Sequence, residues 1–306
     1  MGNYNVPIAF IFFKRLETTK QVFEAIKRQQ PSHLYLIADG ARNDEEAKMV
    51  DAVRAYVEDS IDWECDVHRN YAEKNMGCKN RIISGLNWVF ENTDRALIIE
   101  DDVKPNDSFF RYTEEMLEKY KDDERIMMVG GFNFNGTMSM EDSYWFYNRT
   151  SIWGWATWKR AWAKMDTDMK GWPELKKSGY LKRNFSKKVA TMLVRDTDRA
   201  YYKEVDTWDY TWEYSMIKND GLCILPRVNL VENIGGNDLN ATHTSGDVIN
   251  YDVKELDFPL KHPRHVTLSK EFTDEIESRE GEINYFKEYL KAHLPRNLTK
   301  LFREVK

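Results

Sequence analysis

The chain has 306 residues, of which 42% are hydrophobic and 31% charged, so it is suited to a packed globular core rather than to disorder. Its net charge of -6 gives no indication of nucleic-acid binding. The cysteines, Cys65, Cys78 and Cys223, form no Cys-x-x-Cys pair, which argues against a cysteine-based zinc site and a disulfide framework. This pattern favours a reduced, cytoplasmic protein.

In chain order, apolar runs and helical periodicity alternate through the first 134 residues. Short runs rich in β-branched and aromatic residues predict strands over 6–13, 33–42, 63–69, 95–102 and 125–134. Amphipathic segments predict helices over 18–30, 44–59, 79–92 and 107–123. We expect Thr18 or Thr19 to cap the first helix, and the segment 106–108 to cap the fourth.

The order is less regular after Ser139. Segments 151–162 and 207–221 are rich in tryptophan, and their second halves are predicted to be helical. Segment 222–238 reads as strand, turn and strand. We expect one catalytic domain over 1–262 and a C-terminal helical extension over 263–306.

Membrane spans are not predicted. The apolar run from Pro7 to Phe13 has only seven residues and ends at Lys14, and we see no signal peptide. The tail over 286–306 is basic and carries leucines, so peripheral contact with an anionic membrane surface and a solvated or oligomer-forming helix both stay open.

Alternating strands and helices predict an α/β protein with a mostly parallel central sheet and helices on both faces. Ligands of such sheets bind beyond the carboxyl ends of the strands. Arg15, Asp39 and the run Glu100–Asp102 all follow predicted strands. We therefore expect these side chains to face one crevice.

The run Glu100–Asp102 follows a buried strand directly. Three adjacent carboxylates repel one another and lose hydration where the strand end is enclosed. A Mg²⁺ or Mn²⁺ ion bound by one carboxylate, with substrate phosphates as further ligands, would compensate. The alternative is a solvated turn before the next helix.

Aromatic and acidic residues of the second half are further candidates. Trp158 and Trp162 continue a helical spacing from Trp155, which is typical of core residues. Trp153 and Trp155 flank Gly154 and either line the site or join the core.

Two carboxylates lie among aromatic residues farther along the chain. Asp206 and Asp209 are candidates for a general base, because apolar surroundings raise a carboxyl pKa, and equally for a helix cap. His243 follows a glycine-rich strand end and is either a ligand of a metal or diphosphate or a structural histidine.

The ordered set of segments LYLIADGAR, RNYAEKNMGCKNRIISGLNWVF, ALIIEDDVKPNDSFFRY, SIWGWATWKRAW and WDYTW is similar to GT-A nucleotide-sugar glycosyltransferases. It resembles bacterial members close to the animal N-acetylglucosaminyltransferase I group. The resemblance spans roughly residues 6–245 and implies a Rossmann-like GT-A fold.

The resemblance also implies a role for individual positions. These are Arg15 at the donor diphosphate, Asp39 at the base, Asp101 at the ribose, Glu100 at the donor sugar, Asn75, Gly77 and Lys79 near the phosphates, Asp102 at the metal, and Asp209 as catalytic base. On the residues alone, His243 is a second candidate at the metal, and Trp153 and Trp155 are candidates beside the acceptor. The WDYTW segment is one residue longer than the family's stretch, so Asp206 and Glu213 stay open as the base.

The implied activity is metal-dependent, inverting transfer of a hexosyl or N-acetylhexosaminyl group from a nucleotide-sugar donor, UDP-sugar favoured, to a hydroxyl of a glycan or lipid-linked acceptor. A sugar nucleotidyltransferase is one alternative, although FFKRLETT lacks the glycine-rich basic loop expected after its first strand. A non-catalytic protein that binds nucleotide sugars or carbohydrate is the other.

Overall fold

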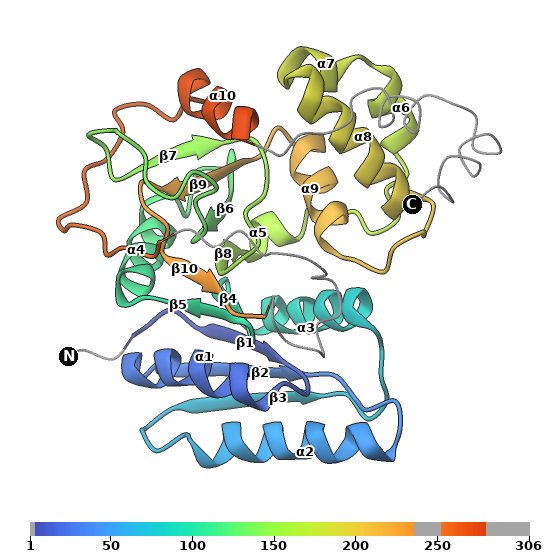
Figure 1. Cartoon of the computed structure of the whole chain (residues 1–306), viewed down its shortest axis with the longest axis vertical. Helices are drawn as coiled ribbons and strands as arrows, with labels where there is room; N and C mark the ends of the chain where they lie inside the picture. Colours follow the sequence, from blue (N-terminus) through green and yellow to red (C-terminus); the bar gives the residue numbers. More distant parts are fainter. Residues whose placement is uncertain (1–3, 236–251, 280–306) are drawn as a thin grey trace.

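An eight-stranded sheet runs through the middle of the protein, and helices cover both of its faces (Figure 1). The computed structural model describes residues 4–235 and 252–279. Its strands are β1 (Ile8–Phe12), β2 (His33–Ala38), β3 (Asp66–Tyr71), β4 (Arg95–Glu100), β5 (Val103–Pro105), β6 (Ile126–Gly130), β7 (Tyr144–Tyr147), β8 (Trp155–Trp158), β9 (Leu222–Pro226) and β10 (Val231–Asn233).

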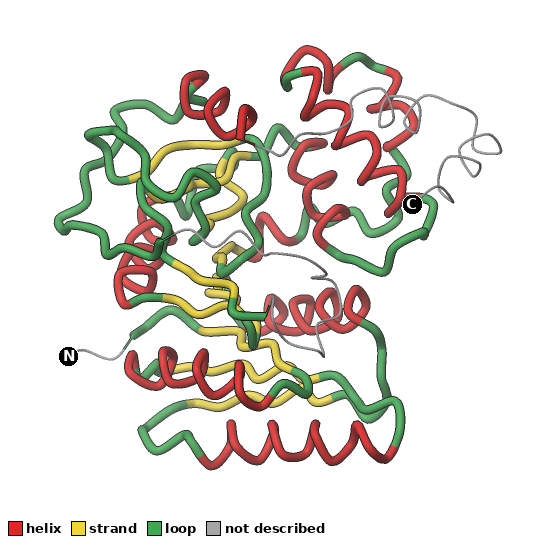
Figure 2. The backbone as a smooth tube through the Cα atoms, in the orientation of Figure 1, coloured by secondary structure: helices red, strands yellow, loops and turns green. Residues whose placement is uncertain are grey.

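The helices fall between these strands, with a group of them in the second half of the chain (Figure 2). They are α1 (Leu16–Gln29), α2 (Asp44–Asp59), α3 (Cys78–Asn92), α4 (Asp107–Lys119), α5 (Lys159–Trp162), α6 (Trp172–Lys177), α7 (Tyr180–Asn184), α8 (Lys187–Tyr201), α9 (Asp209–Lys218) and α10 (Lys270–Arg279).

The strand order is β3-β2-β1-β4-β8-β6-β9-β7. The pairs β3–β2, β2–β1, β1–β4 and β6–β9 are parallel, whereas β8 is antiparallel to both of its neighbours and β7 is antiparallel to β9. Strands β5 and β10 form a separate antiparallel pair. The prediction of a mostly parallel α/β sheet with helices on both faces is therefore confirmed.

Strand β1 shows why the apolar runs form central strands. Ile8, Phe10 and Phe12 pack into one core with residues of α1, α2 and α4, while Ala9 and Ile11 pack into a second core with residues of α3. Successive side chains point to opposite faces of a sheet, and both faces are covered here. A continuous apolar run is the sequence that suits such a strand.

The first helix begins earlier than predicted. The N-cap position is Arg15, and the hydroxyls of Thr18 and Thr19 bond back to the Arg15 carbonyl at 3.2 and 2.6 Å. The threonines therefore lie inside the helix, and the prediction that one of them caps it is wrong. The predicted cap of α4 is confirmed, because Asn106 Oδ1 accepts from the Phe109 N–H at 3.0 Å.

The spacing of Trp155, Trp158 and Trp162 does not mark one helix. Trp155 and Trp158 lie on β8, and only Trp162 lies on the short helix α5. Strand β8 inserts between β4 and β6, and its ladder hydrogen bonds override the helical spacing. Trp158 and Trp162 are buried, as expected for core residues.

Helices α6, α7 and α8 were not predicted. They pack with α9 beside the sheet and have their own apolar core, which includes Met169, Trp172, Leu193 and Tyr214 (Figure 1). Helix α9 lies in the segment 207–221, whose second half was predicted to be helical, but it begins earlier, at Asp209.

Residues after 262 also contact the sheet. On α10 the Phe272 ring lies 5.7 Å from the Trp145 ring of β7, and Ile276 is buried. His243 and the tail over 286–306 lie outside the described residues. The boundary at residue 262 stays a prediction. Within the described part of the chain, none of the helices has the length and apolar character needed to cross a bilayer.

Candidate functional site

A pocket of about 500 Å³ opens where β1, β2 and β4 end. This position beyond the carboxyl ends of the strands is the one predicted for a ligand site. The lining residues come from both halves of the chain. Among the described residues its charged lining consists of the carboxylates Asp39, Glu100, Asp101, Asp102, Asp206 and Asp209 and the guanidinium groups of Arg15, Arg42 and Arg81. With carboxylates in excess, the pocket favours a cation.

The acidic run is partly balanced by an arginine. Asp101 is buried and accepts from the Phe13 backbone N–H at 3.2 Å and from the Arg15 guanidinium. Arg15 Nη1 also lies 3.0 Å from Asp102 Oδ2. One guanidinium group thus faces three neighbouring carboxylates, so part of the expected compensation comes from the protein itself.

Burial and neighbouring charge shift the titration of this run. Burial, together with Asp102 and Asp101, raises the pKa of Glu100. Burial raises the pKa of Asp101 as well, and Arg15 opposes that rise. The raised pKa values show that burial and mutual repulsion disfavour the charged form of these carboxylates, and a bound cation would relieve both effects.

The donor chemistry fits a hard divalent cation. Carboxylate oxygens are the ligands that Mg²⁺ and Mn²⁺ take. In the described part of the chain, Glu100–Asp102 do not bring three ligand atoms within 4.8 Å of one another, so they form no preassembled metal cage.

Local structure holds Asp102 in place. Strand β10 pairs with β5 just after the acidic run, and the Ile234 N–H donates to the Asp102 carbonyl at 2.8 Å. A Cβ atom on Gly235 would lie only 2.5 Å from Asp102 Oδ2. Glycine at this position lets the backbone approach the carboxylate.

Asp39 organises the neighbouring loop. Its carboxylate accepts from the backbone N–H groups of Gly40 at 2.8 Å, Met76 at 2.9 Å and Gly77 at 3.2 Å. The Asn75 side chain donates to the Gly40 carbonyl at 2.9 Å. Both residues line the pocket, and their contact with a donor stays a prediction.

Asp209 also lines the pocket, and it is the first residue of α9. Its carboxylate accepts from the Thr207 hydroxyl and from the Tyr210 N–H at 2.9 Å. Burial raises its pKa, and those two hydrogen bonds counter the rise. The residue therefore meets the sequence-based expectation of a carboxylate in apolar surroundings and also satisfies a donor at a helix start.

Asp206 lines the same pocket and approaches the loop before α3. A Cβ atom on Gly77, whose φ is 78°, would lie 2.8 Å from Asp206 Oδ2. Glu213 is buried and pairs with Arg149 at 2.9 Å, away from the acidic run.

Three predicted site residues are not among those that line the pocket in the described part of the chain. Trp155 is 0% exposed, and its ring stacks on Trp208 at 5.4 Å, so its predicted position beside an acceptor is wrong. Its side chain lies on the face of β8 that packs into the protein core. Lys79 is half-buried and is not part of the pocket lining. His243 lies outside the described residues.

Arg81, Cys78 and Asn233 line the pocket without having been predicted. Arg81 is buried, and it donates to the Asn70 carbonyl at 3.0 Å and to Asn70 Oδ1 at 2.7 Å. An arginine on the apolar face of α3 was the available signal. Burial, with Glu100 next in effect, raises the pKa of the Cys78 thiol to about 12.

A second pocket of about 240 Å³ adjoins the first. The two share Ile152, Trp153 and Asp209 as lining residues. The lining specific to the second pocket includes the aromatic side chains Phe132, Phe134 and Tyr210 and the Arg149–Glu213 ion pair. Trp153 packs on Phe132 with ring centroids 4.5 Å apart. Asp209 therefore faces both pockets.

No protein-family model matches the sequence, and no curated protein matches it. Solved structures that match include a proposed glucose-1-phosphate thymidylyltransferase from Bacillus anthracis in complex with sucrose, with a TM-score of 0.34 and 10% identity over 52% of this chain and 74% of that chain. Another is a 4-diphosphocytidyl-2C-methyl-D-erythritol synthase from Anaerococcus prevotii, with a TM-score of 0.33 and 12% identity over the same 52% and 74%.

Neither structure is described as a member of the N-acetylglucosaminyltransferase I group. At these TM-scores and identities the likeness carries no argument about activity.

Proposed function

We propose that the protein is a metal-dependent, inverting glycosyltransferase of the GT-A type. It moves a sugar from a nucleoside-diphosphate sugar, UDP-sugar favoured, to a hydroxyl of a glycan or lipid-linked acceptor. The observation that carries the proposal is that Asp209 and the run Glu100–Asp102, which come from different halves of the chain, line one pocket. A transferase needs separate groups for the leaving diphosphate and for the acceptor proton.

The acidic wall suits the donor. Asp102, with Glu100 beside it, would hold Mg²⁺ or Mn²⁺, which supplies positive charge to a leaving diphosphate. Arg15 is positioned to add a second positive charge, because its guanidinium already lies at Asp101 and Asp102. Asp39 and Asn75 hold the adjoining loop against which a base and ribose would rest.

Asp209 suits the acceptor. The acceptor oxygen attacks the anomeric carbon, the bond from that carbon to the diphosphate oxygen breaks, and its electron pair leaves with the nucleoside diphosphate. Asp209 takes the acceptor proton, since burial raises its pKa. Attack opposite the leaving group inverts the anomeric centre.

The second pocket offers a place for the acceptor. Phe132, Phe134 and Trp153 provide aromatic surface, on which sugar rings can pack, beside the same Asp209. The Arg149–Glu213 pair can exchange hydrogen bonds with hydroxyl groups. This supports the predicted acceptor-lining role of Trp153.

A sugar nucleotidyltransferase is the rival function, and one of the matched structures is named as a proposed glucose-1-phosphate thymidylyltransferase. Its expected basic, glycine-rich loop is not found here, because helix α1 begins at Leu16 directly after Lys14 and Arg15. Nucleotidyl transfer would also leave the adjoining aromatic pocket without a role.

Reaction products separate these functions. With Mn²⁺, a panel of nucleotide sugars and candidate acceptors, we expect free nucleoside diphosphate and a product whose anomeric configuration, read by NMR, is opposite to that of the donor. Pyrophosphate formed from nucleoside triphosphate and sugar 1-phosphate would establish the nucleotidyltransferase. Saturable donor binding with neither transfer nor slow hydrolysis would establish a binding protein, and retained configuration would contradict the mechanism.

A further inference from the structure

A second group of chemically active side chains lies at the opposite end of the sheet. His33 is the first residue of β2, and Asp66 and His68 lie on the edge strand β3. The candidate pocket begins at Asp39, just after the last residue of β2. Asp39 is six residues after His33 along an extended strand, which places it roughly 20 Å away. This group therefore has no part in the proposed transfer reaction.

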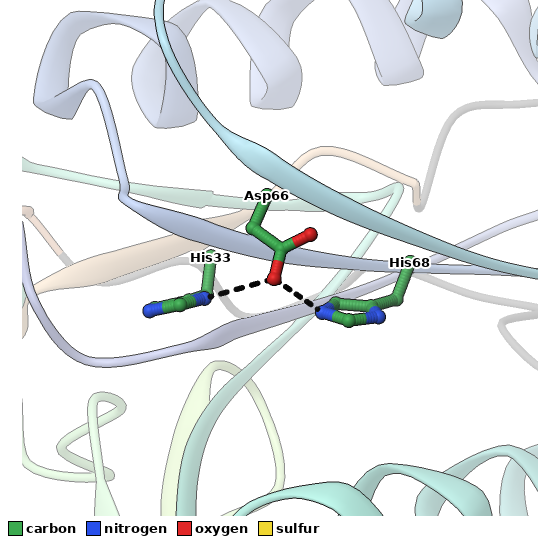
Figure 3. A group of neighbouring side chains, drawn as sticks. All are labelled: His33, Asp66 and His68. Atoms are coloured by element: carbon green, nitrogen blue, oxygen red, sulfur yellow. Dashed lines mark hydrogen bonds and ion pairs between the residues drawn. The ribbon is translucent and has the colours of Figure 1, made fainter.

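The register of the parallel pair brings the three side chains together. His33 is the cross-strand partner of Asp66, and Tyr35 is the partner of His68. Side chains two residues apart on a strand share a face, so Asp66 and His68 point the same way and His33 stands beside them. Figure 3 shows the two imidazole rings on either side of the Asp66 carboxylate.

The atoms are close to metal-binding geometry. Asp66 Oδ2 lies 3.0 Å from His68 Nε2 and 3.7 Å from His33 Nδ1, and the ligand atoms of all three residues lie within 4.8 Å of one another (Figure 3). A tetrahedral zinc ion with bonds of about 2.0–2.2 Å places its ligand atoms roughly 3.4 Å apart. Small side-chain shifts would suffice to bind it.

The neighbouring aromatic residues hold one ligand in position. The His68 ring stacks on Tyr35 with centroids 4.6 Å apart and an interplanar angle of 13°. Tyr35 is buried and packs edge-on against Trp88 of α3 at 5.3 Å. His68 is therefore oriented before any ion arrives, whereas the His33 side chain is 47% exposed and free to adjust.

We propose that His33, Asp66 and His68 form a binding site for a divalent transition-metal ion of the Zn²⁺ class. Two imidazoles and one carboxylate suit zinc and disfavour Mg²⁺, which prefers oxygen ligands. Three protein ligands leave a fourth position for water or for a group from another molecule. The ion would also join the edge strand β3 to β2.

Zinc titration of the full chain tests this site. The protein is treated with a chelator and titrated with ZnCl₂ by calorimetry, with Mg²⁺ in excess to occupy the carboxylate pocket. We expect His33→Ala and Asp66→Asn to lose one zinc per chain or to weaken that zinc by at least about tenfold, the loss that even residues supporting a ligand produce. His265→Ala, at an exposed histidine far along the chain, should bind like the wild type.

Thermal unfolding keeps the test independent of any folding defect. Zinc should raise the unfolding temperature of the wild type and of His265→Ala, but not that of His33→Ala, because an ion that binds only the folded state stabilises it. Equal zinc affinities for His33→Ala and His265→Ala would overturn the proposal, as would the absence of saturable zinc binding. In either case Asp66 would serve only as a hydrogen-bond partner of His68 and an ion-pair partner of His33.

Discussion

At the scale of single residues, the pocket combines groups that sequence position predicts with groups that it does not. Arg15, Asp39, Asn75, Trp153 and Asp209 were expected at the site, and the fold brings all of them to one pocket. Their roles toward a donor and an acceptor stay predictions.

For some residues the sequence does not show whether the side chain reaches the pocket or is buried in the core. The WGW motif gives Trp153 and Trp155 equal claims to the site, but only the strand geometry of β8 shows that Trp155 faces inward. Arg81 reaches the pocket from the buried face of α3, where a charged residue on an apolar helix face was a signal that no sequence motif accompanied.

Replacing the proposed base tests the residue scale directly. Asp209→Asn should lower turnover by about 10²–10⁴, the range that general bases contribute, and should leave donor affinity nearly unchanged. Asp206→Asn is the matched control, because it removes a carboxylate from the same pocket. Turnover is measured by release of nucleoside diphosphate and donor affinity by calorimetry. If the Asp206 variant alone lost turnover, the base would be Asp206.

At the scale of elements, the loop from 72 to 77 depends on a carboxylate outside it. Three backbone N–H groups, from Gly40, Met76 and Gly77, converge on Asp39. The sequence placed Asp39 at the end of a strand, which is correct. It gave no sign of the loop that closes on it, because that loop packs through backbone contacts that residue types do not reveal.

Removing the carboxylate should loosen this loop. Asp39→Ala leaves three N–H donors without their partner, of which that of Gly40 is buried and those of Met76 and Gly77 are partly buried. We therefore expect a loss of unfolding free energy of about 1–3 kcal/mol, the cost of one buried unpaired donor. Asp51→Ala, at an exposed position in α2, should change stability by less than about 0.5 kcal/mol. Urea denaturation measures both, and similar small losses would show that the loop is held by other contacts.

The start of α2 gives the protein a pH-dependent stability. Glu46 is buried and pairs with Lys14 at 2.8 Å, and it accepts from the Arg42 N–H at 2.8 Å. Burial alone would raise its pKa, but the hydrogen bonds from Lys14 and Arg42 outweigh burial and lower the pKa from 4.5 to about 2.

Since the folded-state pKa is the lower one, this stabilisation is fully present above about pH 4.5 and is lost as the pH falls toward about 2. We therefore expect the urea midpoint to fall over that range, and to fall less steeply in Glu46→Gln than in Glu45→Gln, a change at an exposed neighbour. Parallel acid profiles for the two variants would remove Glu46 as a cause.

At the scale of the whole molecule, the first half of the chain was largely predictable, because its parallel strands are continuous apolar runs and its helices are amphipathic. The second half was not. Strand β8 inserts between β4 and β6 by long-range pairing, and helices α6 to α8 form a core of their own. Such contacts override local periodicity, which is why the acidic wall was found from sequence and the adjoining aromatic pocket was not.

The proposed function requires the Asp102 carboxylate to bind a divalent cation together with a nucleoside diphosphate. Crystals grown with Mn²⁺ and UDP, measured at the manganese absorption edge, test it most directly. We expect an anomalous peak within about 2.5 Å of an Asp102 carboxylate oxygen, shared with phosphate oxygens, and no such peak in Asp102→Asn. A nucleotide in the pocket with manganese absent from Asp102, or bound to other carboxylates, would contradict it.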